Sequence, residues 1–208
     1  MKKIERFIFD LDGTLLFGNY QKEQEYFKDK LKDDADLFLE QLFPLLNQYE
    51  KTFPRYNVNQ LATFLTVNSK ALITSDIVEG WIEVNRDMED KIEDNAIEVL
   101  EYLKSKNKSI AVLTNWFKKT QLSRLENSGL LPYIDDIYGG EIYLKPNIES
   151  YLYAMGKYKI DECIMIGDTL EKDYLGPKRI GMEAIYYNPN GIEEDTKIKS
   201  LIKIKERY

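Results

Sequence analysis

Two aspartates stand directly after a short apolar run near the start of the chain, in the order Asp10-Leu11-Asp12. The run Phe7-Ile8-Phe9 is aromatic and β-branched, which predicts a buried strand, and Gly13 permits a tight turn after it. Ligands bind at the carboxyl edge of open α/β sheets. Because two ionised carboxylates held close together repel each other, a proton, a cation or a basic residue must neutralise them. The same segment also fits an acidic turn closed by Asp and Gly, so alone it leaves both interpretations open.

Polar residues follow three further apolar segments in the same way. Thr114 and Asn115 follow Ile110–Leu113, Lys145 follows Tyr143-Leu144, and Asp168 follows Cys163–Ile166 with Asp173 five residues later. Helical segments separate these strands, which predicts right-handed crossovers and a parallel sheet. We therefore expect the polar side chains to converge with Asp10 at one edge of that sheet.

The ordered set resembles the four signature motifs of the haloacid dehalogenase-like (HAD) hydrolase superfamily, whose members are mostly Mg²⁺-dependent phosphatases. The motifs as they stand here are Asp10-Leu11-Asp12-Gly13-Thr14, Thr114-Asn115, Lys145-Pro146 and Gly167-Asp168 with Asp173. The resemblance implies an α/β fold with a Rossmann-like parallel sheet core over residues 1–16 and 90–208. It also implies an inserted all-helical cap domain over residues 17–89, between the first two motifs.

The composition of the 208-residue chain narrows its partners. A hydrophobic fraction of 43% with 31% charged residues is ordinary for a soluble globular protein. The net charge of −7 argues against a nucleic-acid partner, which clustered Lys and Arg would bind. No apolar stretch approaches the roughly 18 residues of a membrane span, and the N-terminus lacks the features of a signal peptide. We expect a cytoplasmic protein with no membrane partner, and the sequence leaves monomer and homodimer open.

The absence of histidine restricts the chemistry further. Ser-His-Asp and Cys-His nucleophile systems and imidazole zinc sites are excluded. A general acid or base must then be a carboxylate, Lys, Tyr or the single cysteine, Cys163, whose apolar neighbours predict a core residue. Any metal site must be rich in oxygen, which favours Mg²⁺, Mn²⁺ or Ca²⁺.

Phosphoryl transfer in such a site needs an oxyanion that is stable at neutral pH, and an aspartate carboxylate is one. Asp10 is the predicted nucleophile, the role that the resemblance also gives it. Asp12 is expected to protonate the leaving oxygen and then deprotonate the attacking water, which requires a pKa raised toward neutrality. Thr14 either holds the tight turn through its hydroxyl or is an ordinary turn residue.

The resemblance implies that Mg²⁺ is held by the Asp10 side chain, the backbone carbonyl of Asp12 and the Asp168 carboxylate. Asp173 fits the family pattern Gly-Asp-x-x-x-x-Asp and either binds the metal or orients Asp168 and water. Alternatively, Asp173 is an acid in the first turn of a helix that interacts with the helix dipole. These alternatives stay open.

Three residues are predicted to bind the substrate phosphate. Lys145 is expected to screen Asp10 from the phosphate and to stabilise charge in the transition state. The Thr114 hydroxyl is expected to donate to a phosphoryl oxygen, and the Asn115 amide either donates there or orients the leaving group. The alternative for Lys145 is an ordinary solvated lysine before a helix.

The segment from about residue 20 to residue 88 is predicted to be helical, because its apolar residues recur at spacings of three and four. Pro44 predicts a kink or break in one helix, Asn57 or Asn59 is expected to cap a second, and Ser75-Asp76 is expected to cap a third. Later strands are expected at Ser109–Leu113, Ile134–Tyr138, Cys163–Ile166, Ala184–Tyr187 and near Ile198–Leu201, with a helix around Glu171–Ile180. A helical lid joined near Gly18 and Asp90 would exclude water from the reacting site.

The predicted function is a Mg²⁺-dependent phosphatase that hydrolyses a small phosphorylated metabolite through an aspartyl-phosphate intermediate. A β-phosphoglucomutase-like phosphomutase is an alternative, because it shares the same acidic residues. A 2-haloacid dehalogenase needs neither a metal nor an acid for a leaving oxygen, so Asp12 argues against it. A catalytically silent module that binds metal or phosphate for regulation is the alternative outside the enzymes.

Overall fold

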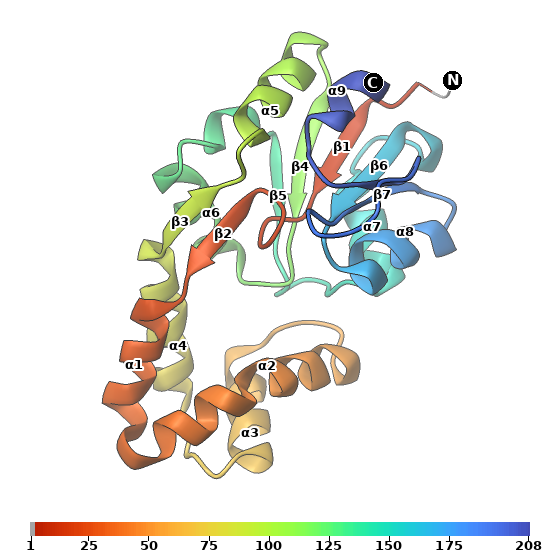
Figure 1. The fold of residues 1–208 in the computed structure, drawn as a ribbon. Helices are drawn as coiled ribbons and strands as arrows, with labels where there is room; N and C mark the ends of the chain where they lie inside the picture. The colour runs from red at the N-terminus through yellow and green to blue at the C-terminus, as the bar shows by residue number, and fades with distance from the viewer. Residues whose placement is uncertain (1–2) are drawn as a thin grey trace.

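The computed structural model describes residues 3–208, and its centre is a six-stranded parallel sheet (Figure 1). The spatial order of the strands is β5-β4-β1-β6-β7-β8. The strands are β1 (Arg6–Phe9), β4 (Ser109–Leu113), β5 (Asp136–Tyr138), β6 (Cys163–Gly167), β7 (Glu183–Tyr187) and β8 (Lys197–Ile198). The expected Rossmann-like α/β core is therefore confirmed, and β1 lies between β4 and β6.

Helices cover both faces of this sheet, which explains why β1 is buried along its whole length. The helices of the core are α5 (Ala96–Ser105), α6 (Lys118–Asn127), α7 (Ile148–Met155), α8 (Gly176–Arg179) and α9 (Lys203–Arg207). Phe7 and Phe9 pack with residues of α5, α6 and α9, whereas Ile8 packs with residues of α7 on the other face. This alternation follows from the two-residue period of a strand.

A helical insertion follows β2 and forms a separate body beside the sheet (Figure 1). It leaves the core through β2 (Leu16–Asn19) and returns through β3 (Glu89–Ile92), and these two strands pair antiparallel. The helices between them are α1 (Gln21–Leu31), α2 (Ala35–Thr52), α3 (Val58–Asn68) and α4 (Ser75–Val84). Phe27, Phe38, Tyr49, Leu61 and Trp81 belong to the apolar core of the insertion, which extends to Phe117 and Leu144.

The helix boundaries within the insertion agree with the sequence signals at Asn57 and differ from them at Pro44 and Ser75. Helix α2 continues through Pro44 instead of breaking there, because its apolar face is packed on both sides of the proline. Asn57 caps α3 as expected, since its side chain accepts a hydrogen bond from Gln60 N at 3.0 Å. Thr74, rather than Ser75, caps α4 by the same kind of bond. An N-cap needs extended backbone, which Thr74 has and Ser75, already helical, lacks.

Two expectations for the core also need correction. Tyr143 and Leu144 are not a strand but follow a turn that leads from β5 to Lys145. The helix expected around residues 171–180 is divided into a wide π turn, Leu170–Leu175, and the short helix α8. Among residues 3–208, no helix combines the length and the hydropathy that crossing a membrane requires.

Candidate active site

Three carboxylates and one ammonium group meet at the carboxyl edge of the sheet. Asp10 follows β1, Asp168 follows β6, and Asp173 lies in the π turn after β6. One oxygen atom of each carboxylate lies within 4.8 Å of the others. Lys145 Nζ donates to Asp10 Oδ1 and to Asp173 Oδ1, at 2.7 Å in both cases. The structure therefore brings together the Asp10, Lys145 and Asp168 side chains, whose convergence the sequence predicts.

Burial makes the electrostatics of this cluster strong. Although burial lowers the pKa of Lys145, the charges of Asp10 and Asp173 raise it above its ordinary value. Burial raises the pKa of Asp10 well above its usual range, against the opposing effect of Lys145, and Asp173 and Asp168 raise it further. Burial and Asp173 likewise raise the pKa of Asp168. The cluster thus holds one ammonium group and three carboxylates. A further cation would neutralise the remaining negative charge.

Two glycines allow the carboxylates to approach the backbone. Gly13 has φ +80°, and a Cβ atom at this position would lie 2.5 Å from Asp168 Oδ2. A Cβ atom at Gly167 would lie 2.4 Å from Asp173 Cγ. The Thr14 hydroxyl donates to Asp168 Oδ1 at 3.5 Å, which places it on this carboxylate rather than only in the turn.

The Asp12 carboxylate is held by two side chains of α6 that the sequence analysis did not single out. Arg124 Nη1 lies 2.6 Å from Asp12 Oδ1, and Gln121 Nε2 donates to Asp12 Oδ2 at 2.7 Å. The same Gln121 nitrogen donates to Thr114 Oγ1 at 3.0 Å. Arg124 also binds both carboxylate oxygens of Asp90 on β3, at 2.9 and 2.6 Å. Asp12 is thereby connected to the strand that leads back from the helical insertion.

The motif residues after β4 divide their roles. Asn115 pairs with the backbone of Lys145: its Nδ2 donates to Lys145 O at 3.0 Å and its Oδ1 accepts from Lys145 N at 2.8 Å. Asn115 therefore positions the lysine through its amide. Thr114 Oγ1 accepts from Trp116 N at 3.2 Å as well as from Gln121. Its remaining capacity is to donate its proton.

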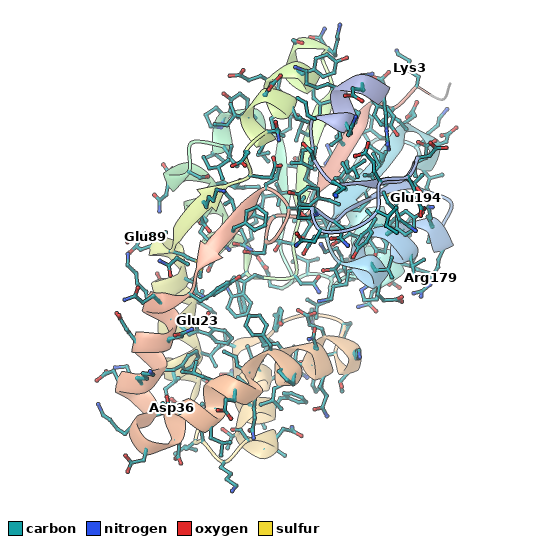
Figure 2. The ribbon with its side chains drawn as sticks, in the orientation of Figure 1. Lys3, Glu23, Asp36, Glu89, Arg179 and Glu194 are labelled. Atoms are coloured by element: carbon teal, nitrogen blue, oxygen red, sulfur yellow. The ribbon has the colours of Figure 1, made fainter. Side chains whose placement is uncertain are left out.

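A cavity of about 370 Å³ opens over this edge of the sheet. Asp10, Asp12, Thr114, Lys145 and Asp168 line it from the core. Tyr20, Glu23, Trp81 and Asn85 are among the residues that line it from the insertion and the turn after α4. Figure 2 shows Glu23 at the end of α1 that is nearer to the sheet. The cavity is thus enclosed between the acidic cluster and the helical insertion.

A family model for haloacid dehalogenase-like hydrolases matches residues 4–181. The chain belongs to this family of hydrolases. Its fold is similar to that of YfnB from Bacillus subtilis, crystallised with bound magnesium, with a TM-score of 0.74 and 20% identity over 99% of this chain and 98% of that one.

Curated relatives match part of this HAD hydrolase. The ribulose-1,5-bisphosphate 5-phosphatase of Halopiger xanaduensis is 31% identical over 100 residues, which are 46% of this chain and 42% of the relative. The pyrimidine 5'-nucleotidase YjjG of Escherichia coli is 32% identical over 111 residues, 48% of this chain and 49% of the relative. The matches thus span less than half the length of these relatives.

The acidic cluster of the HAD hydrolase fits a Mg²⁺ ion. Carboxylate oxygens are hard ligands of the kind that Mg²⁺ binds. Asp10, Asp168 and Asp173 present such oxygens at an edge of the sheet where glycines leave room for the carboxylates. Asp10 and Asp168 leave the sheet from adjacent strands, so both are fixed by the backbone register. The Lys145 ammonium occupies one oxygen of Asp10 and leaves the other for the ion, whereas Lys145 and the Thr169 backbone N–H bind the two oxygens of Asp173.

Mg²⁺ is expected to raise the midpoint of thermal unfolding, and Asp168→Asn is expected to remove most of that rise. The folded chain gathers carboxylates that the unfolded chain disperses, and at 100 times the dissociation constant the stabilisation is about 2.7 kcal/mol. Thermal scans in EDTA and in Mg²⁺ measure the difference. Asp161→Asn, at an exposed position before β6, is the matched control. An equal rise in all three proteins would place the ion elsewhere.

Arg124→Met is expected to lower the free energy of unfolding by about 3–5 kcal/mol, because it leaves a buried carboxylate without its partner. The side chains of Arg124 and Asp90 are only 3% and 4% exposed. The double variant Arg124→Met/Asp90→Leu is expected to recover part of the loss, since it removes both charges. Urea denaturation of the single and double variants measures this coupling. Strictly additive losses would show that the two side chains do not depend on each other.

Proposed function

We propose that this HAD hydrolase is a Mg²⁺-dependent phosphatase that hydrolyses a monoester of a small phosphorylated metabolite through a phosphoaspartate at Asp10. The observation that carries the proposal is the buried Lys145 ammonium between Asp10 and Asp173, with Asp168 alongside, at the floor of the cavity. This arrangement provides a nucleophile, a cation for the phosphate and oxygen ligands for a metal. Phosphatases among the curated relatives support the same reaction class.

The first half of the reaction forms the bond between Asp10 and phosphorus. A carboxylate oxygen of Asp10 attacks the phosphorus atom, the bond to the leaving oxygen breaks, and the proton of the Asp12 carboxyl passes to that oxygen. Lys145 and the Thr114 hydroxyl stabilise charge on the phosphoryl oxygens. Asp10, the Asp12 carbonyl and Asp168 would hold Mg²⁺, which would supply further neutralisation of the phosphoryl charge.

The second half releases phosphate and restores the enzyme. The Asp12 carboxylate takes a proton from water, whose oxygen attacks the phosphorus atom, and the bond from Asp10 to phosphorus breaks. Gln121 and Arg124 orient Asp12 for both proton transfers through the contacts on its two oxygens. Asp173 acts by holding Lys145, and through it the charge balance of the site.

We further infer that residues 17–89 act as a cap over a core formed by residues 1–16 and 90–208. The insertion joins the core through the β2–β3 ribbon and has an apolar core of its own. It also rests on the core loop before Lys145, since Tyr56 N donates to Gly140 O and Leu144 N donates to Pro54 O, both at 2.8 Å. A cap in this position excludes water from the phosphoaspartate.

Phosphate release from a panel of phosphate esters, with Mg²⁺ and with EDTA, tests the proposed function. Turnover that requires Mg²⁺ supports a phosphatase. Isomerisation of a sugar phosphate without net release of phosphate would favour the phosphomutase. Absence of turnover on every ester, together with tight binding of a protein through the insertion, would favour the regulatory module.

A further inference from the structure

We propose that the cap side of the cavity selects phosphate esters whose leaving group is uncharged and carries a hydroxyl or similar hydrogen-bond donor. Glu23 on α1 and Asn85, after α4, form the subsite that receives this group. The inference rests on the proposed phosphatase function and adds a substrate class to it. It starts from two buried polar side chains that the reaction at Asp10 does not use.

The first observation is the position of Glu23. The residue is 5% exposed and lines the cavity. One of its oxygens, Oε2, accepts from Trp81 Nε1 at 2.6 Å and from Asn85 Nδ2 at 2.9 Å. Both protein donors therefore bind the same oxygen. The other oxygen, Oε1, remains to accept a hydrogen bond from a ligand, since no donor within residues 3–208 binds it.

The second observation is an acceptor that stands beside Glu23. Asn85 is also 5% exposed, and its Oδ1 has no hydrogen-bond partner among the described residues. The contact with Glu23 fixes the amide, because only its nitrogen can donate to the carboxylate. Its oxygen is thereby turned away from Glu23. A buried acceptor without a partner is costly, so a ligand donor placed against it is favourable.

The third observation is that the cations around the cavity are already paired. Within residues 3–208, the cationic side chains that line it are Arg124, Lys145 and Lys172. Arg124 is held by Asp12 and Asp90, and Lys145 by Asp10 and Asp173. Lys172 is paired with Glu50.

Carboxylates outnumber cations on the walls of the same cavity. In the described part of the chain the lining acids are Asp10, Asp12, Glu23, Glu50 and Asp168, five against three cations. A carboxylate or second phosphate on the leaving group would meet Glu23 without a free cation to neutralise it, which is unfavourable. A hydroxyl group instead donates to Glu23 Oε1 or Asn85 Oδ1. The walls thus favour neutral polyol or similar leaving groups.

Two three-carbon esters provide the test, because they differ mainly at one end. Glycerol 3-phosphate carries a terminal hydroxyl where 3-phosphoglycerate carries a carboxylate. We expect kcat/KM to be at least about tenfold higher for glycerol 3-phosphate, because a site built to accept a hydrogen bond rejects a ligand that cannot donate one. Phenyl phosphate is measured in parallel as an ester without a donor on its leaving group.

Glu23→Gln is expected to lower the ratio of the two kcat/KM values at least about fivefold, because it removes the charge that repels the carboxylate while keeping the shape. Glu25→Gln, at an exposed position on the same helix, is the matched control and is expected to keep the wild-type ratio. If Glu23→Gln does not fold, Asn85→Ser is measured in its place. Thermal unfolding of each variant accompanies the kinetics.

The outcomes separate the inference from the function on which it rests. Release of phosphate with no preference, or with a preference for 3-phosphoglycerate, overturns the inference and leaves the phosphatase in place. If Glu23→Gln, or Asn85→Ser in its place, leaves the ratio of the two kcat/KM values unchanged, the preference does not come from this subsite and the inference is overturned. Absence of release from all three esters, phenyl phosphate included, overturns both.

Discussion

Asp10→Asn is expected to reduce phosphate release by at least about 10³-fold, since loss of a catalytic nucleophile costs this much or more. An amide oxygen is a poor nucleophile and cannot form the acyl phosphate that a carboxylate forms. The substitution keeps the size of the side chain at a position only 8% exposed. Its effect on turnover therefore reports chemistry rather than packing. Phosphate release from phenyl phosphate at saturating Mg²⁺ measures it.

Two controls accompany this variant: its own thermal unfolding, and the activity of a variant that lacks an acidic residue elsewhere. Lys145 still has Asp173 as a partner when Asp10 is replaced, so the midpoint of thermal unfolding in EDTA is expected to stay close to that of the wild type. Asp36→Asn, on the exposed face of α2 (Figure 2), removes the same charge far from the proposed catalytic aspartates and is expected to keep full activity. Near-normal turnover by Asp10→Asn would assign the nucleophile to another group.

The placement of Asp10 and Asp168 could be predicted from the sequence because it follows from backbone rules. Each residue ends a short apolar run, and parallel strands bring such ends to one edge. The register pairs Phe9 with Ile166, so Asp10 comes level with Gly167 and Asp168 is the next residue along the neighbouring strand. The fold class followed in the same way from the alternation of strands and helices. These inferences needed only local patterns and topology.

The partners of Asp12 could not be predicted with the same rules. Gln121 and Arg124 are buried on α6, yet polar residues three apart on a helix normally describe its solvent face. The available signal was that Leu125 belongs to the same stripe, which puts polar and apolar residues on one buried side. Whether polar side chains can be buried on such a stripe depends on partners remote in sequence, which here are Asp12 and Asp90.

Side-chain roles within a recognised motif also depend on contacts that spacing does not reveal. Asn115 was expected to donate to the phosphate or to orient the leaving group, and in the structure it lines the cavity while its amide pairs with the backbone of Lys145. The aromatic residues of the insertion likewise divide between its core and the cavity. Phe27 and Tyr49 are buried in its core, as a helical stripe indicates, whereas Tyr20 lines the cavity.

Lys145→Met is expected to destabilise the metal-free protein by about 3–5 kcal/mol at pH 7 and to lower turnover at least about 10²-fold. The side chain is 2% exposed and is the ammonium that neutralises Asp10 and Asp173. Methionine fills the volume of the stem but leaves the carboxylates to repel one another. Urea denaturation in EDTA and phosphate release in Mg²⁺ measure the two losses.

The pH dependence distinguishes this electrostatic cause from a packing defect. Burial raises the pKa of Asp10 and Asp168 in the folded protein, and removing Lys145 removes a charge that opposes the rise. A carboxyl whose pKa is higher in the folded state binds more protons there, so stability is retained at low pH and lost as pH rises through the raised pKa. We therefore expect the deficit of Lys145→Met to shrink as the pH falls toward 5 and to shrink at pH 7 when Mg²⁺ is added. Lys118→Met, exposed on α6, is the matched control. A deficit that neither acid nor Mg²⁺ reduces would make Lys145 a packing residue and remove its charge from the proposed mechanism.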